Sequence, residues 1–120
     1  MELELIEQNG IRVIILLTKH LDASNAKSFK DDVTQAIGDA SRSVINLGRL
    51  EFVDSTGLGA LLSCLRHVTS NQGALKLCCM SKPVRTLFEL VRMHRVFEIY
   101  GTQDEALQSF VSNTTAPSGG

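Results

Sequence analysis

Apolar stretches alternate along this chain with segments in which apolar residues recur every three or four positions. The alternating Leu3–Leu5, the Asn9-Gly10 pair and the apolar run Ile11–Leu17 predict a β-hairpin, because Asn-Gly readily adopts the positive φ angles of a type I′ turn. The second strand of this hairpin does not alternate, which indicates a strand that is covered on both faces or lies centrally in a sheet. The pattern favours an α/β or α+β architecture over a β-sandwich.

Four segments have the spacing of amphipathic helices, with one apolar stripe each. The stripes are Ala26, Phe29, Val33, Ala36 and Ile37 in the first, which starts at Asn25; Leu58, Leu61, Leu62 and Leu65 in the second; Val84, Leu87, Phe88 and Val91 in the third; and Ala106, Leu107 and Phe110 in the fourth. Ser81 and Pro83 suit the start of the third helix, and Thr102 with Glu105 forms a capping box for the fourth.

Between these helices, the runs 44–47, 74–80 and 96–100 predict strands, Phe52-Val53 leads into the second helix, and residues 18–25 are polar and turn-like. The order β-β-α-β-α-β-α-β-α predicts an α/β fold in which about four helices pack on a mixed, mostly parallel sheet. Ligands and partners of such folds bind at the carboxyl ends of the strands.

The length of 120 residues corresponds to one domain, which we expect to span residues 1–112. Residues 113–120 are small, polar and unpatterned, and predict a flexible C-terminal tail. The chain has twelve Lys and Arg and thirteen Asp and Glu, so it has no overall positive charge that would attract it to nucleic acid or to an anionic membrane. The aliphatic run Val13–Leu17 is far shorter than the roughly 20 residues of a membrane helix, and the acidic start does not resemble a signal peptide, so we expect a cytoplasmic protein.

The three cysteines, Cys64, Cys78 and Cys79, are expected to be reduced, because their number is odd and no export signal accompanies them. Cys64 and His67 lie one helical turn apart and could in principle join the other two around zinc. Adjacent cysteines on a strand point to opposite faces, however, so Cys78 and Cys79 are poorly spaced to bind one ion. We predict no metal site and no cofactor.

The stretch Asp54-Ser55-Thr56-Gly57-Leu58-Gly59 is the richest in candidate chemistry, because it places an acid, two hydroxyls and two glycines where a strand meets a helix. One interpretation is purely structural: Asp, Ser and Thr are common N-cap residues, and glycine permits tight turns and close packing. The other is that a hydroxyl accepts a phosphate, which the N–H groups and dipole of a helix N-terminus stabilise. Ser55 is the better candidate, since Thr56 is expected to begin the helix and to be partly shielded by it.

Two enzymatic interpretations fail on the same stretch. A nucleophile elbow needs glycine two residues before the serine, where this chain has Val53. A dinucleotide fingerprint beginning at Gly57 and Gly59 lacks its third glycine, because Leu62 occupies that position. We therefore expect a protein that is not an enzyme.

Two other groups of residues could contribute to a binding surface. The region of the third helix is locally basic, which is typical of a solvated helix face and also suits contact with an acidic partner; its residues are Lys82, Arg85, Arg92, His94 and Arg95. Asp22, which follows Leu21 before the first helix, is either a helix-start residue or part of the surface at the strand ends.

Taken together, these segments resemble the STAS domain of bacterial anti-sigma factor antagonists over about residues 2–110. The resemblance is carried by Leu21-Asp22 with Ala26 and Phe29, by Val44-Ile45-Asn46-Leu47, by Phe52-Val53-Asp54-Ser55-Thr56-Gly57-Leu58-Gly59, and by Val96-Phe97-Glu98-Ile99-Tyr100 before Ala106. It implies a single STAS-like domain. Lys19 and Arg92 depart from the family pattern, which commonly has glycine at both positions.

The resemblance implies that a GHKL-type anti-sigma kinase phosphorylates Ser55 and that a PP2C-type phosphatase removes the phosphate and restores the free hydroxyl. It places Asp54 in the acceptor site and Asp22 on the docking surface, and it implies that Gly57 and Gly59 allow close approach of the partner. Thr56 and Leu58 belong to the same partner-binding segment.

The leading hypothesis is partner switching: the unmodified protein binds an anti-sigma kinase and frees a sigma factor, and phosphorylation releases the kinase. One alternative is a STAS module that senses a nucleotide or anion at the same helix N-terminus. Another is a scaffold in a signalling assembly that a phosphatase controls. Direct nucleic-acid or membrane binding is not expected.

Overall fold

The computed structural model describes residues 1–115, with side chains for residues 1–111. Its elements are β1 (Leu3–Gln8), β2 (Ile11–Leu16), β3 (His20–Leu21), α1 (Ala26–Ile37), β4 (Arg42–Asn46), β5 (Phe52–Val53), α2 (Ser55–Ser70), β6 (Ala74–Cys78), α3 (Lys82–Leu90), the 3₁₀-helix η1 (Met93–Arg95), β7 (Glu98–Tyr100) and α4 (Gln103–Thr115).

Five strands form the central sheet in the order β1-β2-β4-β6-β7, and all neighbours are parallel except the β1–β2 hairpin. The turn of that hairpin has φ angles of 56° at Asn9 and 78° at Gly10, as the sequence predicted. Strand β2 lies second in the sheet, and its residues are buried or half-buried, which explains why it does not alternate. The predicted α/β fold with a mostly parallel sheet is confirmed.

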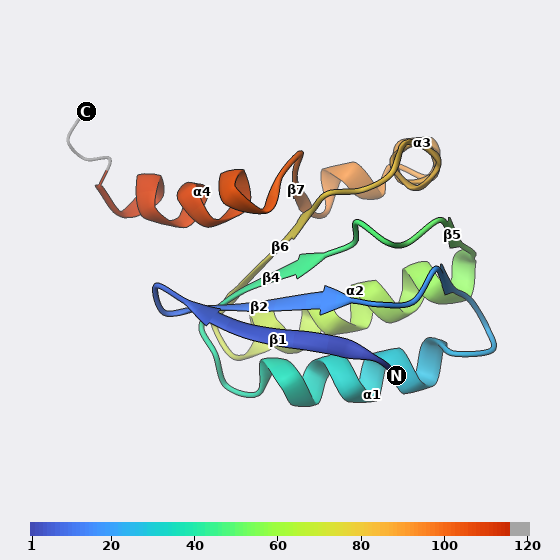
Figure 1. Ribbon diagram of the computed structural model, residues 1–120, viewed down its shortest axis with the longest axis horizontal. Coiled ribbons are helices and arrows are strands. Elements are labelled where there is room, and N and C mark those ends of the chain that lie inside the picture. Colours follow the sequence, from blue (N-terminus) through green and yellow to red (C-terminus); the bar gives the residue numbers. More distant parts are fainter. Residues whose placement is uncertain (116–120) are drawn as a thin grey trace.

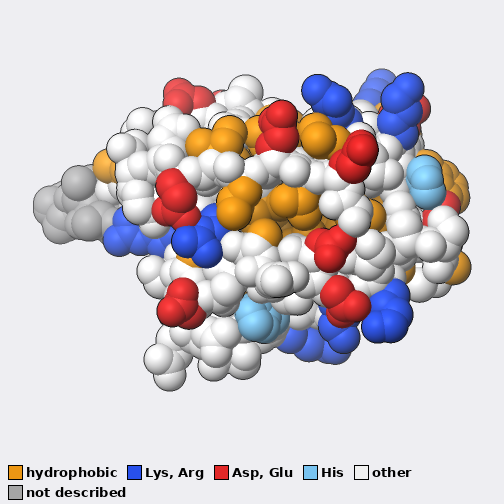
Figure 2. Space-filling model, turned by 60° about the horizontal axis from the view of Figure 1, so that its bottom comes forward, with side chains coloured by type: hydrophobic (Ala, Val, Ile, Leu, Met, Phe, Trp, Pro, Cys, Tyr) orange, Lys and Arg blue, Asp and Glu red, His pale blue; other side chains and the backbone are white. Residues whose placement is uncertain are grey.

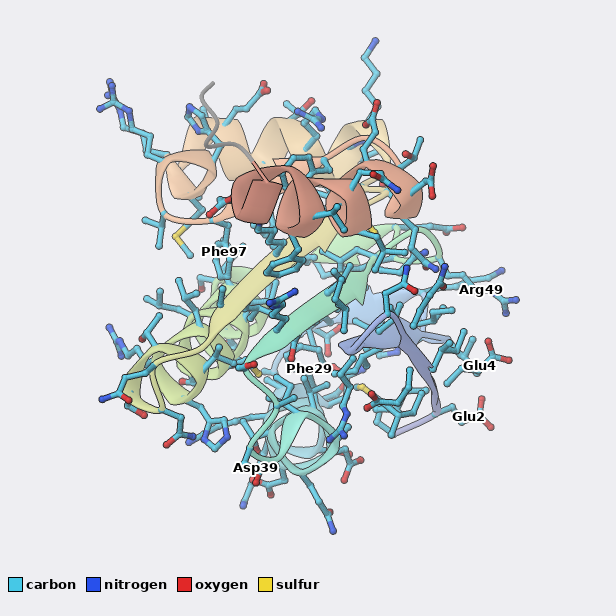
Figure 3. All side chains as sticks on the ribbon, turned by 90° about the vertical axis from the view of Figure 1, so that its left-hand side faces the viewer. Glu2, Glu4, Phe29, Asp39, Arg49 and Phe97 are labelled. Atoms are coloured by element: carbon cyan, nitrogen blue, oxygen red, sulfur yellow. The ribbon has the colours of Figure 1, made fainter. Side chains whose placement is uncertain are left out.

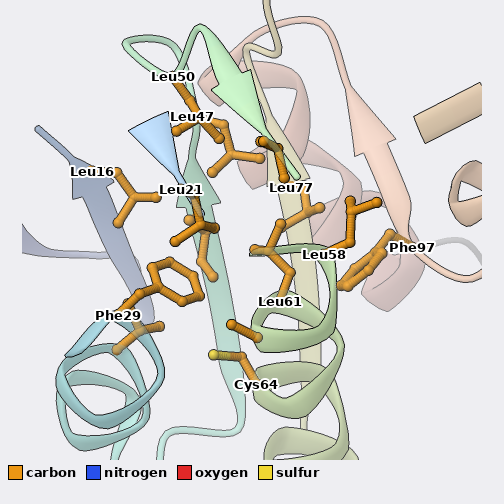
Figure 4. Packing of buried hydrophobic residues seen from close by; sticks show 14 of the residues in the cluster. Leu16, Leu21, Phe29, Leu47, Leu50, Leu58, Leu61, Cys64, Leu77 and Phe97 are labelled. Carbon is orange, nitrogen blue, oxygen red and sulfur yellow. The ribbon is translucent and has the colours of Figure 1, made fainter. Parts of the chain in front are cut away.

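Helices cover both faces of this sheet (Figure 1). On one face, α1 and α2 pack against the strands and enclose the main hydrophobic cluster, to which Phe29 of α1 and Leu61 of α2 contribute fully buried side chains (Figure 4). The stick view along the strands shows α4 on the opposite side of the sheet from α1, while Glu2 and Glu4 project outward at its edge (Figure 3).

Helix α4 buries a second, smaller cluster against the sheet. Its Ala106, Leu107 and Phe110 pack on Val13 and Val44 of the strands. The predicted capping box begins this helix: the Glu105 N–H donates to Thr102 Oγ1 (3.0 Å), and the Thr102 N–H donates to Glu105 Oε1 (3.3 Å).

Three details differ from the sequence prediction. The turn-like segment 18–25 contains β3, which pairs in parallel with β5 as a separate two-stranded sheet. The last strand begins at Glu98 and not at Val96, because η1 occupies the preceding residues. Helix α4 continues to Thr115 and so includes residues 113–115 of the predicted tail; the remainder of that tail, 116–120, lies outside the described residues.

Candidate functional site

The small β3–β5 sheet brings together two aspartates that are far apart in the sequence. Leu21 pairs with Val53, and each is followed directly by an aspartate, Asp22 or Asp54. The Asp54 N–H donates to the Leu21 carbonyl oxygen (3.2 Å), which continues the pairing by one residue. Sequence analysis placed Asp54 at a strand end and left Asp22 as either a helix-start residue or part of the strand-end surface; in the structure both follow paired strands that lie side by side.

Asp54 is the N-cap of α2 and also holds the neighbouring loop. Its Oδ1 accepts a hydrogen bond from the Gly57 N–H (2.9 Å), and its Oδ2 accepts one from the Ala23 N–H (3.3 Å). The structural interpretation of this acid is thus correct: the cap satisfies a first-turn amide, a role worth about 1 kcal/mol. The second bond fixes the start of α2 against the loop that leads into α1.

Asp22 is the centre of a compact hydrogen-bond network. Its carboxylate accepts from the Ser24 hydroxyl (2.6 Å) and the Ser24 N–H (2.9 Å), and it lies 3.1 Å from His20 Nδ1. These two bonds from Ser24, followed by the effects of His20, hold the pKa of Asp22 below its ordinary value. Asn25 completes the loop by accepting from the Asp22 N–H (2.9 Å) and donating to the His20 carbonyl oxygen (2.9 Å).

Ser55 is the first residue of α2, and its side chain is exposed. Thr56 is exposed as well, so the prediction that the helix partly shields it was wrong. The reason is the helical rotation of about 100° per residue: the first two residues of α2 face solvent, and the next two, Gly57 and Leu58, face the core. Exposure alone therefore does not distinguish the two hydroxyls.

The remaining residues of the predicted partner-binding segment divide between core and surface. Gly57 is buried, and a Cβ at this position would lie 2.3 Å from the Leu21 carbonyl oxygen. Leu58 is only 7% exposed and belongs to the main core. Gly57 and Leu58, which were expected to be partner-binding residues, both pack inward, so neither is exposed at the surface. Gly59 is exposed and has no atom within 4 Å of a built Cβ, so it remains available to a partner.

We call the exposed part of this region the strand-end surface, defined by His20, Asp22, Ser24, Phe52, Asp54, Ser55, Thr56 and Gly59. Sequence analysis missed His20, Ser24 and Phe52. The Phe52 side chain is 54% exposed although it is a large hydrophobe. The signal for it lay in the pair Phe52-Val53, whose side chains must point to opposite faces if the pair forms a strand; Val53 is the buried one.

Among the described residues, no group of three or more His, Cys, Asp or Glu side chains is placed to hold a metal ion. Cys64 lies in the α1–α2 core and Cys78 in the cluster under α4, so the sheet separates them. Burial raises the pKa of the Cys64 thiol to about 12. The basic residues of α3 and η1 are all exposed, as expected of a solvated face.

A surface hollow of about 210 Å³ between β1 and α1 is lined by residues none of which is Lys or Arg: Met1, Glu2, Thr18, Asn25 and Ser28. It offers no cationic side chain to a phosphate.

Figure 2 shows acidic and basic side chains interspersed over the face that it presents, in agreement with the net charge of −1. Among the helices of residues 1–115, none is long and apolar enough to cross a bilayer.

Comparison with known proteins agrees with this architecture. A family model described as the STAS domain matches residues 2–106. An anti-sigma F factor antagonist of Paenibacillus polymyxa is 25% identical over 89% of this chain and 92% of its own. The crystal structure of a putative anti-sigma factor antagonist of Thermotoga maritima has a TM-score of 0.77 at 25% identity, and covers 89% of this chain and 92% of that one.

The anti-sigma factor antagonist SpoIIAA of Bacillus has the same fold in two solved forms. Its unphosphorylated form has a TM-score of 0.64 and its phosphorylated form one of 0.66, both at 24% identity over 91% of this chain and 97% or 99% of theirs. The family match covers nearly all of the described residues and every element of the strand-end surface, so the chain belongs to the STAS domain family.

Proposed function

We propose that this chain is an anti-sigma factor antagonist that switches partners through phosphorylation of Ser55. The observation that carries the proposal is the position of this hydroxyl: it is exposed, it begins α2, and it stands on a surface that Asp22 and Asp54 hold in place. Relatives that cover most of this chain are named anti-sigma factor antagonists, and one protein of this fold is known in a phosphorylated form.

The chemistry assigned to this chain is that of a substrate and a binding surface. A partner kinase of the GHKL type supplies ATP and the catalytic groups, and a PP2C-type phosphatase removes the phosphate. Phosphorylation adds about −1.5 to −2 charges to a surface that already carries Asp22 and Asp54. The N-terminal end of the α2 dipole favours the phosphate within this chain, while a docked partner meets the added charge and must desolvate it.

The size of the effect needed for switching is modest. A thousandfold loss of affinity corresponds to about 4 kcal/mol. Like-charge repulsion and the burial of an unpaired charge in an interface each cost several kcal/mol. The Phe52 side chain is suited to supply the apolar contact that such an interface needs in the unmodified state, since it is more than half exposed and lies three residues before Ser55.

The test is intact-mass analysis of the purified chain after incubation with its cognate kinase and ATP. Wild type is expected to gain one phosphate, Ser55→Ala to gain none, and Thr56→Ala to behave as wild type; Thr56 is the matched control because it is the adjacent exposed hydroxyl. A phosphate that persists in Ser55→Ala and disappears in Thr56→Ala would overturn the choice of acceptor.

A binding measurement tests the switch itself. Ser55→Ala should bind the kinase as wild type does, whereas Ser55→Asp should bind more weakly. Equal affinities of the two variants would contradict partner switching. Recovery of a phosphatase or sensor assembly without any kinase, in pull-downs from source cells, would instead favour the scaffold alternative.

A further inference from the structure

The end of β6 places two adjacent sulfur atoms on the same side of the sheet. Cys78 is the last residue of β6, and Cys79 has a φ angle of 69°, in the left-handed region. The two Sγ atoms are 3.4 Å apart, and both side chains pack in the cluster under α4. The sequence-based expectation that these cysteines point to opposite faces was wrong, because the alternation of a strand does not continue through a left-handed residue.

The two thiols differ in their access to solvent. Cys78 is fully buried, and burial together with the adjacent thiol raises its pKa above the ordinary value. Cys79 is half-buried and donates its S–H toward Cys78 Sγ. A small reagent therefore reaches Cys79 first and finds a second sulfur in contact with the first.

We propose that Cys78 and Cys79 form a vicinal dithiol that a peroxide oxidises to a reversible disulfide. The Cys79 thiolate attacks one oxygen of hydrogen peroxide, the O–O bond breaks, and the products are a sulfenic acid on Cys79 and hydroxide. Cys78 Sγ then attacks the sulfenic sulfur, the S–O bond breaks, and the Cys78 proton leaves with the hydroxyl as water. The two thiols together lose two electrons, and hydrogen peroxide takes up these two electrons when its O–O bond breaks.

The contact between the two sulfurs favours formation of this disulfide, and the short Cα separation favours its reduction. The two sulfurs at 3.4 Å must approach by only about 1.3 Å to reach a bond length of about 2.05 Å. The Cα atoms of adjacent residues are about 3.8 Å apart, below the range of about 4.4–6.8 Å that ordinary disulfides prefer. Strained disulfides are the reducible, regulatory kind, so we expect a small thiol to restore the pair.

The segment that contains the pair is bonded to the loop between β4 and β5. The Leu47 N–H donates to the Cys78 carbonyl oxygen (3.0 Å), and the Ser81 hydroxyl donates to the Leu50 carbonyl oxygen (3.1 Å). A Cβ built on Gly48 would lie 3.5 Å from that of Cys79. Ring closure at the pair is therefore expected to loosen this loop, with faster hydrogen exchange at Leu47. The proposal does not depend on the function of Ser55.

Oxidation can be mapped on the full-length chain with two tryptic peptides. Trypsin cleaves after Lys76 and not between Lys82 and Pro83, so it releases the pair in residues 77–85, while Cys64 is carried by residues 50–66. The reduced protein is treated with hydrogen peroxide, blocked with N-ethylmaleimide and digested. In wild type we expect peptide 77–85 to lose two hydrogens and take up no maleimide, and dithiothreitol to reverse this.

Two variants and one probe make the result specific. Cys64→Ser should leave the oxidation unchanged, and Cys79→Ser should abolish it. Phenylarsine oxide, which bridges two neighbouring thiols, should protect the pair of the native wild-type protein from alkylation and should not protect the single thiol of Cys79→Ser. The proposal is overturned if Cys79 proceeds to sulfinic acid while Cys78 remains alkylatable, or if the disulfides that form join two chains.

Discussion

Replacement of Gly57 by alanine tests how the strand-end surface is held together. Gly57 does not have a positive φ angle, so alanine fits its backbone conformation. The obstacle is space: the new Cβ would lie 2.3 Å from the Leu21 carbonyl oxygen and 2.9 Å from both the Leu21 carbonyl carbon and its Cγ. The nearest of these atoms belongs to the backbone of β3, which cannot move away as a flexible side chain can.

The cost follows from the movement required. A nonbonded carbon and oxygen need more than 3 Å, so α2 and β3 must separate by nearly 1 Å, and overpacking of this kind costs about 1–3 kcal/mol. The shift also stretches the bond from the Asp54 N–H to the same Leu21 oxygen, now 3.2 Å. Alanine recovers about 1 kcal/mol through its higher helix propensity. The overpacking and the stretched bond, less this gain, leave an expected net loss of about 1–2 kcal/mol.

Gly59 is the matched control, two residues along the same helix. A Cβ at Gly59 meets no atom within 4 Å, so Gly59→Ala should gain up to about 1 kcal/mol from helix propensity alone. Urea unfolding followed by circular dichroism measures both variants, with the slope m checked for constancy. If Gly57→Ala were as stable as Gly59→Ala, the close contact between α2 and β3 would not be what requires glycine at this position.

Five further substitutions, at four positions, have expected outcomes in the same unfolding assay. Arg92 has φ 63° and ψ 22°, so Arg92→Gly should relieve left-handed strain and stabilise the protein by up to about 1 kcal/mol, whereas Arg85→Gly inside α3 should destabilise it by about 1 kcal/mol. Asp54→Ala should cost about 1–2 kcal/mol through loss of the cap, and Asp54→Asn, which keeps a capping oxygen, less than about 0.5 kcal/mol. Ser43 Oγ is buried without a hydrogen-bond partner among the described residues, so Ser43→Ala should be neutral or stabilising by up to about 1 kcal/mol. If Ser43→Ala instead destabilised the protein by more than about 1 kcal/mol, this hydroxyl would have to make a stabilising contact.

The order of the main elements could be predicted because it is encoded locally. Asn9-Gly10 determines the hairpin turn, and Thr102 with Glu105 determines the start of α4, each through contacts within a few residues. Strand β3, and its pairing with β5, could not be predicted in this way. Each strand has two residues, and each exists only because the other lies beside it, so no periodicity reveals the pair.

The sequence could predict the position of Asp54 and Ser55 in the candidate site, but not which of their neighbours share the exposed surface. Asp54 and Ser55 follow an apolar strand end and precede a helical stripe, which places them at the strand-to-helix junction. Which neighbours face solvent depends on the rotation of α2 relative to β3, a tertiary contact made by Gly57. For the same reason His20 could not be assigned to the site: its position depends on a strand that the sequence does not display.

The contacts that position the proposed acceptor, Ser55, do not involve its own side chain. Asp54 caps α2 and holds Ala23, and Gly57 packs against Leu21, so the first turn of the helix is fixed from its buried side. The Ser55 side chain is exposed and makes no hydrogen bond with another described residue. Changes at such a surface position usually alter stability by less than about 0.5 kcal/mol. A phosphate on Ser55 can therefore change what the surface binds while the fold beneath it stays the same, which is the property that a partner switch requires.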